Sequence, residues 1–448
     1  MQGQVPEEGG KGNAAPRLVA VLLQRIGHLV PQMTSLAVRA VAVLAGLAVT
    51  YLIGNRFGAA ATGQYALITQ TATMFAAAGL LGLDVSVVRH LAKSIASKTP
   101  LAMGLLLRVL GAGFGMMAIV VIALYLGGKT FWTPLFGDVV TIDLLLVLAL
   151  MVIGRGGANL LSGLLRAQHR FALAVAVAAL VVPLAVSVAL FAGWADDVDG
   201  ALWVAVAGGY AAVLLGLFFT IKGAAWKGPT VNVPMRAIMT SSLPLWGAGM
   251  AHVLGEWYGL AVAARMLGAA DAGLYRVSFQ AASMLLLTSS TLLAVYAAQI
   301  STAFHAQDRE KVARLARSAV RLSTALGIPL ALILLFGGKF LLGQIGEEFV
   351  AALPVLFVMV GGQLVIAMTG PSGLVVAMSG NERVNLAISL SGTVATLLIA
   401  PLAAYWGGLL ALSVCIVAVM IIRNLYAYSY VKRKLGINIW AGTAIARN

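Results

Sequence analysis

The nine residues LGAADAGLY (Leu267–Tyr275) have a near copy, FGAAATGQY (Phe57–Tyr65), which lies 210 residues earlier in the chain. At the same offset, Phe57–Phe75 aligns with Leu267–Leu285, and eight of the 19 positions are identical. An isolated match between strings rich in Gly and Ala is weak evidence, because these two residues are abundant throughout the chain. The question is therefore whether the register holds elsewhere.

The register does hold further along the chain. Ser162-Gly163-Leu164 aligns with Ser372-Gly373-Leu374 at the same offset and without a gap. Composition alone does not readily produce two matches in one register, so we predict that the chain is an internal duplication.

The composition shows what kind of chain carries the duplication. Of the 448 residues, 61% are hydrophobic and 10% are charged, and the mean hydropathy is +0.96. A soluble domain has about 25% charged residues. Apolar runs of 18 or more residues predict membrane spans, because crossing about 30 Å of hydrocarbon takes about 20 helical residues. We find such runs near residues 34–54, 64–88, 101–126, 144–165, 171–193, 200–221, 240–264, 274–301, 319–342, 350–378, 384–406 and 408–430.

These runs predict an all-α polytopic membrane protein, since only helices satisfy the backbone of single spans in lipid. Six spans per repeat make two lobes of the same orientation, a parallel repeat that secondary transporters often use around a central site. The expected organisation is a cytoplasmic N-terminal segment with an interfacial helix (1–33), a first six-helix lobe (34–222), a cytoplasmic linker (223–239), a second six-helix lobe (240–430) and a cytoplasmic tail (431–448).

The net charge of +15 does not indicate a nucleic-acid partner. Most Lys and Arg residues fall in loops on one side of the predicted spans, whereas acids such as Asp196, Asp197 and Asp199 fall on the other. The positive-inside rule explains this pattern and places both termini in the cytoplasm. Cys415 is the only cysteine, which excludes an intrachain disulfide.

Arg155, in MVIGRGGANLL, is the ionisable residue placed deepest in a predicted span. A charge at this depth is costly, so it indicates a function. A guanidinium matches the geometry of phosphate oxygens and stays charged when it is desolvated. We therefore interpret Arg155 as a diphosphate ligand; the alternative is an arginine bonded to carbonyls of a broken helix. The glycines beside it leave room for a large group or for close helix contact.

Three further arginines are candidates for the same ligand. Arg39 and Asp84 lie at similar depth near the inner ends of the first two spans, and Arg89 follows. A structural pair of Asp84 with Arg39 or Arg89 is the first interpretation, and a diphosphate entrance formed by Arg39 and Arg89 is the second. Arg276 lies two residues inside its span, so we expect its side chain to reach the outer surface, with substrate binding as the alternative.

Two other pairs of polar residues lie within the spans. His252 and Glu256 are four residues apart and share a helix face. Such an acid is typical of proton or cation coupling, because burial changes the proton affinity of a carboxylate. Charge compensation for an arginine, or a His–Glu hydrogen bond, is an equal alternative. Gln70 and Gln280 are equivalent in the repeat and would either bind sugars or, as we favour, join helices.

The remaining patterns argue against other protein classes. GAGFG (111–115) lies inside an apolar run, so Gly111 and Gly115 predict close helix packing instead of a nucleotide loop. No metal-ligand spacing and no cluster of His and carboxylates on a large loop is present, which disfavours an enzyme. No filter-like motif indicates a channel. We expect neither a metal nor a cofactor.

Several stretches resemble a known family. GAAATGQYALITQTATMFAAAGLLGLDVSVVRHLAKS (58–94) resembles the beginning of polysaccharide-export and O-antigen flippases, which belong to the multidrug/oligosaccharidyl-lipid/polysaccharide (MOP) exporter superfamily. Residues 306–363 are similar to the family's cytoplasmic loop, ninth helix and the start of the tenth, and residues 380–412 to its last two helices. The resemblance covers roughly residues 30–435.

The resemblance implies a V-shaped pair of six-helix lobes in a bacterial inner membrane. It implies that an undecaprenyl-diphosphate-linked oligosaccharide crosses by alternating access, with membrane lipids, H⁺ or Na⁺, and polysaccharide polymerase or assembly proteins as partners. A lipid II flippase is disfavoured because its two extra helices are not found. The alternative is a cation-coupled multidrug exporter of the same superfamily. Three arginines against two acids within the spans favour an anionic cargo.

Overall fold

The part of the chain that the structure describes folds into twelve helical passes. The computed structural model describes residues 14–95, 99–136, 142–227, 230–231, 233–370 and 372–444. Within these residues, eight helices are long and apolar enough to cross a membrane. Two of the eight, Thr34–Leu80 and Arg383–Leu435, contain a glycine break and make two passes each. Helices α8 (Met235–Met266) and α9 (Ala269–His305), both longer than the roughly 20 residues of a crossing, complete the set.

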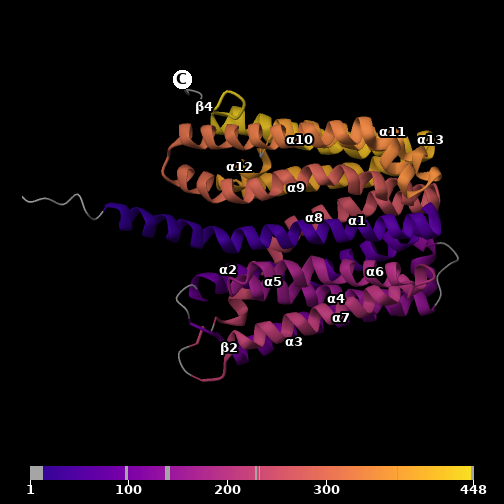
Figure 1. Cartoon of the computed structure of the whole chain (residues 1–448), viewed down its shortest axis with the longest axis horizontal. Helices are drawn as coiled ribbons and strands as arrows, with labels where there is room; N and C mark the ends of the chain where they lie inside the picture. The colour runs from indigo at the N-terminus through magenta and orange to yellow at the C-terminus, as the bar shows by residue number, and fades with distance from the viewer. Residues whose placement is uncertain are drawn as a thin grey trace, which may run out of the picture.

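The long helices lie nearly side by side (Figure 1). The first half contains α1 (Ala14–Leu80), α2 (Leu83–Ile95), α3 (Met103–Phe136), α4 (Ile142–Ala167), α5 (Phe171–Val175), the π-helical turn η2 (Ala176–Leu180), α6 (Val181–Ala192) and α7 (Val198–Lys222). After α8 and α9 follow α10 (Arg309–Ile345), the 3₁₀ turn η3 (Glu347–Ala352), α11 (Leu353–Thr369), α12 (Ser372–Met378), α13 (Glu382–Tyr430) and the π-helical turn η4 (Val431–Leu435). Short strands β1 (Leu101–Ala102) and β2 (Ala224–Ala225) pair in parallel, and β3 (Ile437–Asn438) and β4 (Thr443–Ala444) pair antiparallel.

The two copies of the repeated motif form the same turn. Gly58 breaks α1 with φ 84° and ψ −176°, and Gly268 precedes α9 with φ 107° and ψ 170°. Only glycine adopts this region without strain, because it lacks a Cβ. Both turns lie at one end of the bundle, which we call the turn end. The opposite end carries β3 and β4 and is called the tail end (Figure 1).

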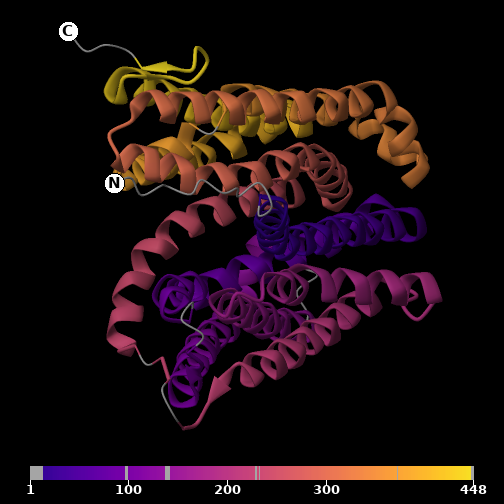
Figure 2. The ribbon, with the colours of Figure 1, turned by 60° about the vertical axis from the view of Figure 1, so that its left-hand side comes forward.

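The two halves form two bundles, and Figure 2 shows them one above the other. Each bundle has its own buried core, around residues such as Leu160 and Val186 in the first half and Met359 and Ala404 in the second. Helix α8 belongs to both bundles: Ile238 near its start packs in the first core and Leu260 in the second. In Figure 2, α8 arcs from one bundle to the other. The predicted two-lobe fold is confirmed.

The repeated motifs also hold the lobes together at the turn end. A Cβ at Gly63 would lie 1.9 Å from the carbonyl oxygen of Ala269, and a Cβ at Gly273 would lie 2.0 Å from that of Ala59. Each copy therefore places a glycine against the backbone of the other copy. The motif is repeated because the second part of α1 and the first part of α9 pack backbone to backbone across the lobe interface.

A hydrogen bond reinforces this closure. The backbone N–H of Ala59, at the start of the second part of α1, donates to Oε1 of Glu348 at 2.7 Å. Asn55 Nδ2 donates to the carbonyl of Ile345 at 3.2 Å. Glu348 and Ile345 belong to the second lobe, so the turn between α10 and α11 caps a helix of the first lobe.

Replacing Glu348 by Ala is expected to loosen the turn end. Loss of a side-chain cap costs about 1 kcal/mol, which corresponds to roughly a fivefold shift of an equilibrium. Thr62 is buried near this contact, so a cysteine introduced there becomes accessible when the turn end opens. Cys415 is replaced by Ser, and the rate at which a maleimide labels the new cysteine in the purified protein measures the opening. The exposed neighbour Glu347 provides the control. Equal labelling of Glu348→Ala and Glu347→Ala proteins would contradict the role of the cap.

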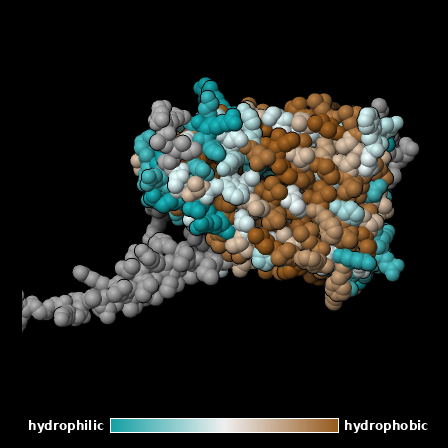
Figure 3. Space-filling view, turned by 90° about the horizontal axis from the view of Figure 1, so that it is seen from above, coloured by the Kyte–Doolittle hydropathy of each residue, from teal (hydrophilic) through white to brown (hydrophobic). Residues whose placement is uncertain are grey.

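The surface agrees with a membrane location. Figure 3 shows a broad hydrophobic band across the middle of one face and hydrophilic residues mostly at the ends. Large side chains such as Phe336, Phe191 and Trp406 are exposed, as expected of groups that face lipid. The protein is therefore a multi-pass membrane protein.

Two local expectations need correction or qualification. Gly111 and Gly115 have no neighbouring atoms within 4 Å of an added Cβ, so the predicted packing through them is wrong; Gly113 packs on Leu160 instead. The interfacial helix predicted within residues 1–33 is continuous with the first span, because α1 begins at Ala14. Its interfacial position stays a prediction, since its side chains lie outside the described residues.

Candidate functional site

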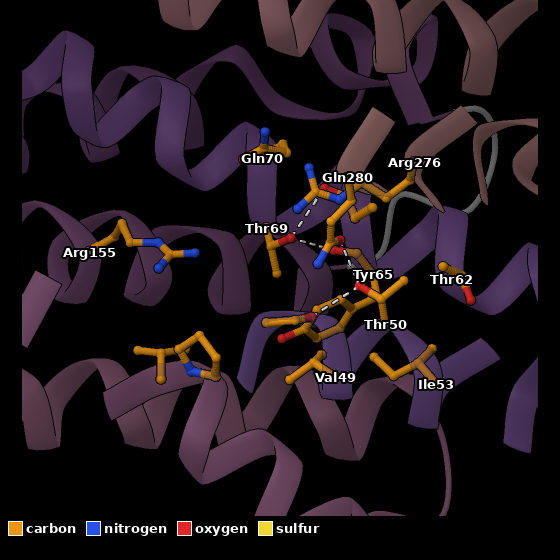
Figure 4. A pocket seen from close by; sticks show the side chains of 14 residues that line it. Val49, Thr50, Ile53, Thr62, Tyr65, Thr69, Gln70, Arg155, Arg276 and Gln280 are labelled. Atoms are coloured by element: carbon orange, nitrogen blue, oxygen red, sulfur yellow. Dashed lines mark hydrogen bonds between the residues drawn. The ribbon is translucent and has the colours of Figure 1, made fainter. Parts of the chain in front are cut away.

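A cavity of about 110 Å³ lies where the two lobes meet. Figure 4 shows Arg155 and Arg276 pointing into it from opposite sides, and Tyr65 also lines it. Arg155 comes from α4 in the first lobe, and Arg276 from α9 in the second. The lining residues are Gly46, Val49, Thr50, Ile53, Thr62, Tyr65, Ala66, Thr69, Gln70, Arg155, Val182, Pro183, Arg276 and Gln280.

The central cavity is basic. No Asp or Glu lines it, and neither Arg155 nor Arg276 forms an ion pair within the described residues. The Glu256 carboxylate acts on Arg276 electrostatically, the two guanidinium groups act on each other, and both act on the Tyr65 phenol. Glu256 offsets part of the repulsion between the two arginines, and an anion bound between them would offset more of it. The outward position expected for Arg276 is therefore wrong: its side chain reaches the central cavity.

The sequence around Arg155 packs α4 tightly against its neighbours. A Cβ at Gly156 would lie 2.0 Å from Sδ of Met117, and one at Gly157 would lie 2.9 Å from Phe114. The glycines thus provide close helix contact, the second of the two expected uses. Arg155 also lines a smaller void of about 10 Å³ together with Val177, which belongs to the π-helical turn η2. π-helical turns occur frequently at functional sites.

Neutral polar groups complete the central cavity. Thr50 Oγ1 donates to Oε1 of Gln280 at 2.8 Å, which joins α1 to α9 across the lobes. Gln280 therefore joins helices, as favoured, and also lines the cavity with its repeat equivalent Gln70. Thr69 bonds back to the carbonyls of Tyr65 and Ala66, so its polar group is satisfied within its own helix.

The other predicted cationic positions lie elsewhere. Arg39 and Arg89 are exposed and do not line the central cavity. Asp84 forms no ion pair within the described residues, and its electrostatic neighbour is Arg166, so the expected pairing with Arg39 or Arg89 is not observed. A diphosphate entrance at Arg39 and Arg89 stays a prediction.

A second cavity, of about 70 Å³, lies inside the second lobe and contains the predicted acid. Nε2 of His252 is 3.5 Å from Oε1 of Glu256, so this pair forms as the spacing predicts. Three other residues that line this cavity were not identified from the sequence: Tyr275, Gln363 and Arg423. Tyr275 was visible as the repeat equivalent of Tyr65, whereas Gln363 and Arg423 carried no signal.

A line of polar contacts joins the lobes between the central cavity and the tail end. Trp257 Nε1 donates to Thr71 Oγ1 at 2.9 Å, and Trp246 Nε1 donates to the carbonyl of Ala77 at 3.1 Å. Nearer the tail end, Oγ of Ser241 is 2.8 Å from Nε2 of His90. These contacts connect α8 with α1 and α2, so α8 binds the first lobe from Ser241 to Trp257.

The fold and the central cavity define a class of protein. A multidrug resistance transporter of the MATE family and MOP superfamily, in an inward-facing conformation, superimposes with a TM-score of 0.66 at 11% identity; the match covers 90% of this chain and 98% of that chain. The lipid II flippase MurJ, inward closed, also gives 0.66, at 10% identity over 90% and 87%. The MATE multidrug transporter DinF-BH gives 0.62 at 15% identity over 98% and 100%. The chain has the fold of MOP-superfamily transporters.

The sequence identifies the family within this fold. The profile described as polysaccharide biosynthesis protein matches residues 33–298. The chain therefore belongs to the polysaccharide biosynthesis protein family, which confirms the resemblance found in its sequence. None of the curated protein sequences matches it significantly.

Proposed function

We propose that this protein carries a polyprenyl-diphosphate-linked oligosaccharide across the cytoplasmic membrane, for the synthesis of a surface polysaccharide. The observation that supports this most directly is the pair Arg155 and Arg276, which enter one cavity from opposite lobes; no Asp or Glu of the described residues lines this cavity, although Glu256 acts on Arg276 electrostatically. Two planar guanidinium forks suit a diphosphate, which presents several anionic oxygens to donors on either side. The family match supports a role in polysaccharide synthesis.

The cavity volume indicates which part of the cargo this conformation accommodates. A cavity of about 110 Å³ holds several water molecules, since one water needs roughly 10–15 Å³ on this measure of volume. It is suited to the charged headgroup, while the saccharide requires the lobes to move apart. Because one arginine comes from each lobe, a bound diphosphate would contribute to holding the lobes together, and its release would accompany their separation.

The orientation follows from the charge distribution. The tail end carries the basic residues Arg309, Lys311, Arg314 and Lys432–Lys434, and under the positive-inside rule such a basic end supports a cytoplasmic location. The sealed turn end then faces the outside. In this orientation the structure is closed outward, and both termini are cytoplasmic.

A cation-coupled multidrug exporter is the second candidate. The acidic Glu256 in the second-lobe cavity and the fold shared with a MATE transporter favour it. However, the two lobes share a basic cavity, which repels cationic drugs. The two functions therefore differ in the charge of the ligand that binds at Arg155 and Arg276: anionic for the lipid carrier and cationic for the drug exporter.

Deletion of the gene is expected to cause accumulation of one polyprenyl-diphosphate-linked oligosaccharide in the cell that carries it. Mass spectrometry of the extracted polyprenyl lipids measures this, and it identifies the saccharide at the same time. Complementation with the intact gene should restore the lipid profile. An unchanged profile, together with increased sensitivity to cationic drugs, would favour the exporter instead.

A further inference from the structure

One hydroxyl group that lines the central cavity has no partner within the described residues. The hydroxyl-bearing residues of the lining are Thr50, Thr62, Tyr65 and Thr69. Thr50 bonds to Gln280 across the lobes, and the hydroxyls of Thr62 and Thr69 bond to carbonyls of the preceding helical turn. Oη of Tyr65 forms no hydrogen bond within the described residues. Such a group is completed by water or by a ligand.

The second part of α1 presents this hydroxyl to both arginines. Tyr65 is three residues from Thr62 and four from Thr69, so the three share one face of the helix. Figure 4 shows the Tyr65 side chain in the cavity. Arg155 of the first lobe acts on the phenol most strongly, and Arg276 of the second lobe also acts on it. A ligand that reaches both guanidinium groups therefore also comes close to the phenol.

We propose that Tyr65 is a third ligand of the anion held by Arg155 and Arg276, to which its hydroxyl donates one hydrogen bond. The inference rests on the proposed function, because it requires a diphosphate at the two arginines. The terminal oxygens of a diphosphate each accept more than one hydrogen bond, so two guanidinium forks leave room for a further donor. The phenol would replace a water molecule of the empty cavity.

A neutral donor suits the charge of this cavity. The proposed cargo is esterified at both phosphates, so each phosphate carries one negative charge, and the two guanidinium groups already balance them. A third cation would add repulsion in the empty cavity, which Glu256 offsets only at Arg276. The Tyr65 hydroxyl adds a directional contact without adding charge.

The internal repeat provides a matched control. Tyr275 is the equivalent of Tyr65 at the offset of 210 residues, but it lines the second-lobe cavity and not the central one. It is 2% exposed, its ring stacks on Phe279, and its hydroxyl packs against Gly259. Tyr275→Phe therefore removes the same oxygen atom outside the proposed site.

The affinity of the purified full-length protein for undecaprenyl diphosphate, measured by microscale thermophoresis, tests the proposal. We expect Tyr65→Phe to weaken binding about tenfold, the effect of losing a hydrogen bond to a charged group, and Tyr275→Phe to leave it unchanged. Salt screens interactions between charges. The affinity of the Tyr65→Phe protein should therefore fall with KCl as steeply as that of the unaltered protein, whereas Arg155→Ala should make this dependence shallower.

A double-mutant cycle separates a shared ligand from a change in packing. If Tyr65 and Arg155 hold one anion, the loss in the protein that combines Tyr65→Phe with Arg155→Ala should be smaller than the product of the separate losses. Size-exclusion chromatography checks that each protein is folded. An equal loss in both tyrosine variants would indicate a general packing effect and overturn the proposal.

Two further outcomes distinguish this proposal from the proposed function. Equal affinities of the folded Tyr65→Phe protein and the unaltered protein would overturn the role of Tyr65 and leave the diphosphate at Arg155 and Arg276 standing. If the unaltered protein does not bind undecaprenyl diphosphate, the proposed function fails, and the role of Tyr65 fails with it.

Discussion

Replacing Arg155 by Ala is expected to weaken binding of undecaprenyl diphosphate by about 10- to 100-fold and to stop translocation. A hydrogen bond to a charged group contributes about 1.5–3 kcal/mol, and each 1.4 kcal/mol is a tenfold change in affinity. Replacing Arg155 and Arg276 together should cause a larger loss of affinity, because no other cation among the described residues lines the central cavity. Microscale thermophoresis of the purified protein with this lipid measures the affinity.

Two further variants separate the geometry of the guanidinium from its charge. Arg155→Lys keeps the charge but loses the planar fork, so it should recover only part of the affinity. Arg265 lies exposed in the last turn of α8 and does not line the cavity, so Arg265→Gln should bind like the unaltered protein. Equal affinities of the Arg155→Ala and unaltered proteins would show that the diphosphate binds elsewhere.

Replacing Gly63 by Ala is expected to prevent closure of the turn end and to abolish transport while the chain still folds. The new Cβ would lie 1.9 Å from the carbonyl oxygen of Ala269, and neither backbone can yield without moving its helix. Overpacking of this kind costs about 1–3 kcal/mol, so a closed state in which the lobes touch loses roughly 5- to 100-fold in population.

Maleimide labelling of a cysteine at Thr62, with Cys415 replaced by Ser, measures the population of the open state. We expect much faster labelling in the Gly63→Ala protein than in its parent. Gly111→Ala is the matched control, because a Cβ at Gly111 meets no atom within 4 Å. Labelling at the parental rate in a folded Gly63→Ala protein would mean that the closed contact at this glycine is not part of the transport cycle.

Periodicity and repetition made the fold predictable from the sequence. Apolar runs of sufficient length predict spans because lipid offers no partner for a free backbone group. The two glycine turns were predictable as equivalents because the motif is repeated in the sequence. In the structure, Gly58 and Gly268 share a backbone conformation that other residues avoid. The spacing of His252 and Glu256 likewise predicted that they meet, since contacts within one helix depend only on local geometry.

The central site was predictable only in part. The depth of Arg155 in its span indicated a function, but the sequence did not show that Arg276 approaches the same cavity from the other lobe. Its position near a span end suggested that it reaches the surface, whereas the packing of α1 against α9 turns it inward. Arg39 and Arg89 had similar sequence signals and lie exposed instead.

The sequence by itself determined the class of the chain: a duplicated set of membrane helices whose basic residues gather on one side. Tertiary structure alone decided which polar side chains share a cavity, because Arg155 and Arg276 line one cavity from distant helices, and Glu256 and Gln363 line another in the same way. The tertiary structure also explains why the motif LGAADAGLY (Leu267–Tyr275) has a near copy at Phe57–Tyr65. Gly63 and Gly273 each receive the backbone of the other copy, and only the folded pair of lobes brings these two glycines together.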